Sequence, residues 1–93
     1  MRTIEPTTRF KRDWKRELKG PHRGTLNAEF PTLLHALARD EPLPERMRDH
    51  ALTGEWKDHR DCHVRPDLVL IYRKTVDARL QLVRLGSHAE LGV

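Results

Sequence analysis

Three histidines in the second half of the chain stand beside other polar residues and could do chemistry together: His50, His63 and His88. Asp67 follows His63 by four residues, just across Pro66. If His63 ends one strand and Asp67 begins the next, both side chains point at the same edge of a sheet. His88 comes directly after the last expected strand and can reach that edge if the strands align. These residues form a candidate catalytic set.

This combination of side chains is suited to cleaving RNA without a metal ion. Breaking a phosphodiester through the neighbouring 2′-hydroxyl needs one group to remove that proton and another to protonate the departing 5′-oxygen. Histidine titrates at about pH 6.5, so two histidines can divide these roles at neutral pH. Fixed positive donors stabilise the developing charge on the phosphate, and this half carries Arg60, Arg65, Arg73 and Arg84. The competing interpretation is that each histidine is an ordinary surface or core group.

The single cysteine, Cys62, limits both disulfide and metal chemistry. One cysteine cannot close an internal disulfide, which is typical of a reducing cytosol and predicts a cytoplasmic protein. Cys62 and His63 are adjacent, so on a strand they point to opposite faces, and there is no Cys-x-x-Cys pair. We therefore expect no metal and no cofactor. No apolar run approaches the roughly 20 residues of a membrane helix, so no membrane partner is expected.

Basic residues are concentrated between Arg9 and Gly24, where seven of them accompany only two acidic residues. Arg9, Arg12, Arg16 and Lys19 recur at intervals of three and four, so they line one face of a helix. Such a cluster favours an anionic partner, either nucleic acid or an acidic protein. A solvated helix face is the other interpretation. We take these four residues and the four arginines above as candidate RNA-binding residues.

The first half of the chain predicts two helices. A helix over residues 9–19 follows Thr7 and Thr8, which are candidate N-caps, and its apolar residues recur every four positions. A second helix is expected over residues 26–39, where several apolar residues share one face. Pro31 is awkward inside this second helix and predicts that it starts late or bends. The two helices together make a hairpin with one apolar side.

The second half predicts strands. Residues 67–74 are rich in β-branched side chains, typical of a buried central strand, and residues 79–85 alternate well enough to be its hairpin partner. Residues 59–64 form a shorter strand, and residues 1–5 could add an edge strand. The order β-α-α-β-β-β indicates a single α+β domain over residues 1–93. Its two N-terminal helices pack on a mostly antiparallel sheet of about four strands.

The second half also carries short motifs in a distinctive order. They are Arg48-Asp49-His50-Ala51-Leu52, Gly54-Glu55-Trp56-Lys57, Arg60-Asp61-Cys62-His63, Pro66-Asp67 and Leu85-Gly86-Ser87-His88. This series resembles the YafQ branch of the RelE-like toxins, and the resemblance covers roughly residues 10–91. So many short motifs in one order are more specific than any single histidine.

The resemblance implies a RelE-like fold and a toxin of a bacterial type II toxin–antitoxin pair. Toxins of this kind are endoribonucleases that cut messenger RNA in the decoding site of a translating ribosome. The implied partners are a cognate antitoxin, the ribosome with its ribosomal RNA, and the messenger RNA substrate. The implied catalytic positions are His50, His63, Asp67 and His88, the four residues that the chemistry also singled out.

For the roles of this set we expect His63 with Asp67 on the base side and His88 on the acid side. His50 then positions or stabilises the scissile phosphate, and the acid and base roles could exchange. Two alternatives come from other classes: a non-enzymatic RNA- or ribosome-binding module, and a ParE-type toxin that acts by binding a topoisomerase. The four-residue set argues against both, because binding alone does not need it.

Two positions depart from the family pattern. Gly92 follows Leu91, where a Phe is common, and Leu68 follows Asp67, where a Trp is frequent. If those aromatic rings stack on a codon base in relatives, we expect the codon preference of this chain to differ or to be looser.

Overall fold

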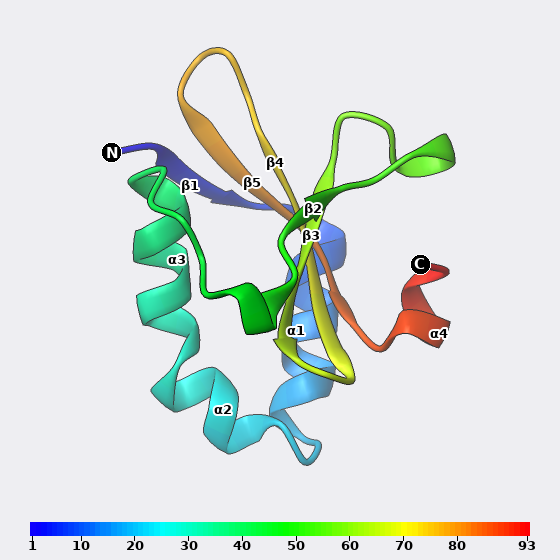
Figure 1. Ribbon diagram of the computed structural model, residues 1–93. Coiled ribbons are helices and arrows are strands. Elements are labelled where there is room, and N and C mark those ends of the chain that lie inside the picture. The colour runs from blue at the N-terminus through cyan, green and yellow to red at the C-terminus, as the bar shows by residue number, and fades with distance from the viewer.

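A five-stranded sheet forms the centre of the protein, and the computed structural model describes residues 1–93 (Figure 1). The strand order is β1 (Thr3–Pro6), β5 (Arg79–Gly86), β4 (Leu68–Lys74), β3 (Arg60–Arg65) and β2 (His50–Ala51). Every neighbouring pair is antiparallel except β1 and β5, which run parallel. The predicted α+β class with a mostly antiparallel sheet is confirmed. The sheet has five strands rather than about four, because β2 adds a short edge strand.

Three helices, rather than the two expected, precede the main strands: α1 (Thr8–Leu18), α2 (Arg23–Ala28) and α3 (Phe30–Ala38). The helix expected over residues 26–39 is divided at Glu29, which ends α2 and directly precedes α3. Pro31 lies in the first turn of α3, where a missing N–H breaks no helical hydrogen bond. The same proline inside one continuous helix would remove such a bond, so the chain starts a new helix instead.

The sheet separates two hydrophobic clusters, and β4 contributes to both. On the side of the three helices, 15 buried residues form the larger cluster, which includes Leu70 and Tyr72. On the other side Val69 and Ile71 pack with Leu91. A strand buried on both faces explains the continuous apolar run in its sequence. None of the helices is long and apolar enough to cross a membrane.

The short helix α4 (His88–Leu91) lies on the sheet face away from α3, and Figure 1 shows the two helices on opposite sides. A capping box starts α4. Ser87 Oγ accepts from the Glu90 N–H at 3.1 Å, and the Glu90 carboxylate accepts from the Ser87 N–H at 2.9 Å. Leu91 then packs against β4. The cap therefore fixes the direction in which the chain leaves β5 and enters His88.

A β-bulge near the end of β5 decides which of its residues reach the core. Consecutive residues of β4 pair with Leu82 and Arg84, so Val83 has no partner on β4. The extra residue lets Leu82 and Leu85, three positions apart, both enter the cluster on the helix side. Simple alternation along this strand, as the sequence suggests, would have placed them on opposite faces.

A buried ion pair joins α1 to the end of β5. Asp13 is only 4% exposed and accepts hydrogen bonds from Arg84 Nε at 2.7 Å and from the Leu85 N–H at 3.0 Å. Arg16 on the same helix donates to the Leu85 carbonyl at 2.8 Å. Burial by itself raises the pKa of Asp13, but the bonds from Arg84 and Leu85 outweigh it and hold that pKa below its ordinary value. Helix α1 thereby anchors the backbone just before His88.

We expect Asp13→Ala to lower the free energy of unfolding by about 3–5 kcal/mol at pH 7, because it leaves Arg84 buried without its carboxylate. Denaturant titration measures this loss. Since the pKa of Asp13 is lowered on folding, its charge stabilises the fold above the unfolded pKa, and this stabilisation is lost as pH falls through the folded pKa. The difference between wild type and variant should therefore shrink in acid. Glu5→Gln, which breaks an exposed pair with Arg79, is the control and should change the midpoint little. Equal losses in the two variants would contradict the prediction.

Candidate active site

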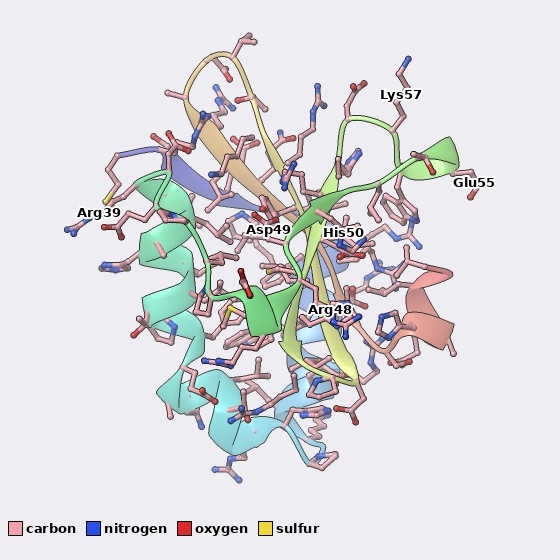
Figure 2. The ribbon with its side chains drawn as sticks, viewed as in Figure 1. Arg39, Arg48, Asp49, His50, Glu55 and Lys57 are labelled. Atoms are coloured by element: carbon pink, nitrogen blue, oxygen red, sulfur yellow. The ribbon has the colours of Figure 1, made fainter.

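His50, His63 and His88 come from three different elements and line one cavity of about 290 Å³. The elements are β2, β3 and α4. Figure 2 shows His50 at the start of β2, directly after Arg48 and Asp49. The structure thus brings the three predicted histidines together, although they lie far apart in the sequence.

Strand pairing positions the floor of this cavity. Along β3, Cys62 and Val64 enter the core on the helix side, while Asp61 and His63 line the cavity on the opposite side. β2 pairs with β3 so that His50 stands opposite Asp61. Cys62 is fully buried on the face away from His63, and burial raises the pKa of its thiol well above the ordinary value. It is a core residue and takes no part in the cavity.

Asp61 is a member of this site that the sequence reasoning missed. It is 2% exposed, and its Oδ1 forms an ion pair with His50 Nδ1 at 3.2 Å. Burial raises the pKa of the Asp61 carboxyl, and the charges of His50, His63 and His88 oppose that rise. The signal that could have found it is its spacing: Asp61 and His63 are two apart on a strand and so share a face.

His63 and His88 are in direct contact. Their ring centroids are 4.8 Å apart and the rings meet edge to face at 74°. Burial lowers the pKa of His63, and the charge of His88 lowers it further. A lowered pKa leaves His63 neutral at pH 7, the state in which an imidazole can accept a proton. The pair therefore offers one proton acceptor next to a second titratable group.

Asp67 lies outside this cavity. It belongs to the turn between β3 and β4, its side chain is 74% exposed, and its Oδ2 is 3.4 Å from His22 Nε2. The turn carries Asp67 past the end of β3, toward the loop between α1 and α2, instead of back toward His63. The structure does not bring Asp67 to the three histidines, and its catalytic role stays a prediction.

Half of the predicted RNA-binding residues form ion pairs within the protein: Arg16, Arg60, Arg65 and Arg84. Arg84 is the most buried of them and bonds Asp13, as described above. Arg60 bonds Asp49 at 3.2 Å, and Asp49 also accepts from the buried Tyr72 hydroxyl. The other predicted residues are exposed and form no ion pair: Arg9, Arg12, Lys19 and Arg73. They are free to meet an external anion, and their role in RNA binding stays a prediction.

Two arginines that the sequence reasoning left out lie beside His63. Arg46 and Arg48 line a hollow together with His63 and Pro66. Arg48 has a left-handed backbone (φ 47°), a conformation that the structure on either side must hold in place. Its charge is one of the causes that lower the pKa of His63. Arg48 stands two residues before His50 in the motif Arg48-Asp49-His50, but nothing in this spacing showed that Arg48 lies near His63.

The two positions that depart from the family pattern have different surroundings. Leu68 is fully buried in the cluster on the helix side, away from the cavity. Gly92 lines the cavity, with Val93 and Trp56. Trp56 is the only aromatic side chain apart from the histidines in this lining, and it also packs against the smaller hydrophobic cluster.

We expect the imidazole of His63 to titrate below the 6.5 of a free histidine. His88→Gln should raise the pKa of His63, because the charge of His88, which lowers that pKa, is removed. Two-dimensional NMR of the histidine ring protons against pH measures this change. His59→Gln is the control, since the His59 ring packs on Trp56, with centroids 5.4 Å apart, outside the cavity. A His63 titration that moves equally in both variants would show that the contact with His88 is not its cause.

A family model described as "Bacterial toxin of type II toxin-antitoxin system, YafQ" matches residues 2–93. The chain is 52% identical over 50 residues to the "mRNA interferase toxin YafQ" of Escherichia coli strain K12. That alignment spans 54% of this chain and 53% of the relative, so it covers about half the length of each.

Solved structures extend the similarity over the whole chain. YafQ from E. coli strain BL21(DE3) is 36% identical with a TM-score of 0.82, covering 98% of both chains. The toxin chain of the E. coli DinJ–YafQ complex is 35% identical with a TM-score of 0.78, again covering 98% of both chains. The fold and the motifs therefore agree, and the family prediction is confirmed. This chain belongs to the YafQ family of bacterial toxins of type II toxin–antitoxin systems.

Proposed function

We propose that this toxin is an endoribonuclease that cuts messenger RNA on translating ribosomes and is neutralised by a cognate antitoxin. The convergence of His50, His63 and His88 on one cavity is the observation that carries this proposal. The E. coli K12 relative is an mRNA interferase by name, which supports the substrate class. The DinJ–YafQ complex supports an antitoxin partner. Translating ribosomes are cytoplasmic, so the protein acts in the cytoplasm.

The cleavage is an attack of the 2′-oxygen on the adjacent phosphorus. His63, held neutral at pH 7, accepts the 2′-hydroxyl proton as the new O–P bond forms. His88 donates a proton to the departing 5′-oxygen as that P–O bond breaks. The products are a 2′,3′-cyclic phosphate and a 5′-hydroxyl, and no metal ion enters the step. The 4.8 Å between the two rings lets both act on one phosphodiester.

Positive charge near the cavity stabilises the phosphorane-like transition state. Arg46 and Arg48 take this role, because both line the hollow beside His63. His50, exposed at the cavity mouth, positions the phosphate. Exposed cations on α1, at its C-cap and on β4 provide a separate electrostatic contact with ribosomal RNA: Arg9, Arg12, Lys19 and Arg73.

The antitoxin has a different surface available. An apolar cavity of about 450 Å³ lies between β1, α1 and α3, and the partly exposed Trp14 contributes to its wall. Lys11 and Lys15 of α1 line the same cavity, and neither forms an ion pair within the protein. An acidic segment with one apolar face, folding as it binds, matches both the apolar wall and the lysines. The adjoining basic face of α1 would then be covered as well, which removes the contact with ribosomal RNA.

The nuclease proposal is tested by mapping 5′ ends of one messenger RNA in a purified bacterial translation mix. Wild-type toxin should produce discrete, ribosome-dependent cuts. His88→Ala should lower the cleavage rate by roughly 10²- to 10⁴-fold, because the leaving 5′-oxygen loses its acid. His35→Ala, on the exposed surface of α3, is the matched control and should cut like wild type. Intact RNA with translation nonetheless stalled would favour the non-enzymatic binding module.

The antitoxin surface makes a second prediction. The double variant Lys11→Glu, Lys15→Glu should weaken the complex with the cognate antitoxin roughly tenfold or more, because like charges then meet across the interface. Titration calorimetry at two salt concentrations measures the affinity, and the loss should be smaller at high salt. Lys57→Glu, on the exposed loop before β3, is the control. Unchanged affinity of the double variant would move the antitoxin to another surface.

A further inference from the structure

The junction between β5 and α4 contains a close approach that a side chain would prevent. Gly86 ends β5 and is buried, and Figure 1 shows this strand leading through a short turn into α4. A Cβ atom added at Gly86 would lie 2.8 Å from Arg16 Nη2 and 3.1 Å from Glu90 Oε1. Ordinary van der Waals contacts are about 3.5–4.0 Å long, so only glycine lets the guanidinium of Arg16 lie this close to the backbone.

The guanidinium of Arg16 reaches both sides of this junction. Its Nη2 donates to the carbonyl of Leu85, the residue before Gly86, at 2.8 Å. Its Nε is 3.3 Å from Oε2 of Glu90, which belongs to α4. The other oxygen of Glu90 accepts from the Ser87 N–H and so takes part in the cap of α4. One side chain of α1 therefore holds the end of β5 and the start of α4 together.

Two carboxylates of α1 orient that guanidinium. Asp13 Oδ1 accepts from Arg16 Nη1 at 3.1 Å, and Glu17 Oε2 accepts from Arg16 Nε at 2.9 Å. A single exposed ion pair contributes little to stability, but several contacts made at once fix a planar group in one orientation. Each of the three guanidinium nitrogens donates to an acceptor within the protein. Arg16, which the sequence analysis took as an RNA-binding residue, is thus directed inward.

His88 is the residue whose place depends on this arrangement. It is the first residue of α4, a helix of only four residues. Two attachments fix the direction of so short a helix: Leu91 packs against β4, and Arg16 holds the junction before it. The ring of His88 then meets that of His63 edge to face, with centroids 4.8 Å apart.

We propose that Arg16 is a positioning residue of the nuclease site, which sets the place of His88 by holding β5 to α4 through Leu85 and Glu90. The proposal rests on the proposed nuclease function, in which His88 protonates the departing 5′-oxygen. Arg16 does not line the cavity and acts only through His88. A displacement of about 1 Å in a reacting group can lower a rate about 10²-fold, so the contact matters for kcat more than for KM.

Two variants break this contact in different ways. Arg16→Ala removes the guanidinium, and Asp13 keeps its other hydrogen bonds, so the protein should still fold. Gly86→Ala keeps the guanidinium but displaces it with the added Cβ, and the backbone there has no positive φ that would strain an alanine. The matched controls are Arg23→Ala, which removes an exposed arginine of α2, and Gly24→Ala, whose Cβ meets no atom within 4 Å.

The first measurement is made on the protein alone. NMR of the histidine rings should show weaker cross-peaks between His63 and His88 in Arg16→Ala and in Gly86→Ala than in wild type. The pKa of His63 should rise toward its ordinary value, because the charge of His88, which lowers it, then lies farther away. Both controls should match wild type. Wild-type ring contacts and a wild-type His63 titration in the two variants would overturn the proposal.

The second measurement is ribosome-dependent cleavage of messenger RNA. Each variant should lower kcat roughly 10- to 100-fold with little change in KM. In the Arg16→Ala background, Gly86→Ala should lower kcat little further, because no guanidinium remains to be displaced. A raised KM with wild-type kcat in Arg16→Ala would make Arg16 an RNA ligand and overturn the proposal. If wild-type protein cuts no RNA at all, the nuclease function fails, and the NMR result alone decides whether Arg16 positions His88.

Discussion

The alternation of side chains along β3 connects the stability of this protein to its site. Cys62 and Val64 point into the core on the helix side, and Asp61 and His63 point into the cavity on the other side. A slip of one residue in the pairing with β4 would exchange the two sets. The observed register is favoured because the slip would remove Cys62 and Val64 from the larger hydrophobic cluster and put the polar Asp61 and His63 there. The hydrophobic effect therefore fixes the register that places the histidine.

Helix α1 also serves both the fold and the surface, although none of its residues lines the cavity of the three histidines. One of its flanks carries Asp13 and Arg16, which bond the end of β5 and so determine where His88 begins α4. Its outer face carries exposed basic residues, and another flank borders the apolar cavity with Lys11 and Lys15. A partner bound to α1 thus contacts the same helix that anchors the backbone before His88. Surface recognition and the geometry of the site share one structural element.

The sequence predicted what repeats at short range and missed what depends on contacts across the fold. The three main strands, the family and the grouping of the histidines followed from local patterns. The division of the second helix followed in part: Pro31 predicted a late start or a bend, and the structure has two separate helices on either side of Glu29. Arg84 looked like an RNA ligand because its partner Asp13 is 71 residues away in the chain. Asp67 looked close to His63 because the path of the turn between them cannot be read from spacing.

Two buried carboxylates in this protein have pKa values that are shifted in opposite directions. Asp13 and Asp61 are almost equally buried, at 4% and 2% exposed. Hydrogen bonds from Arg84 and Leu85 outweigh burial at Asp13, so its pKa is lowered and its charge belongs to the fold. At Asp61 burial prevails and the pKa is raised, because only titratable histidines stand opposite. A permanently charged partner such as Arg84 keeps a buried carboxylate ionised, and the pair then stabilises the fold. A histidine in the same place makes its electrostatic stabilisation depend on where a proton is, which is the property that a proton-transfer site requires.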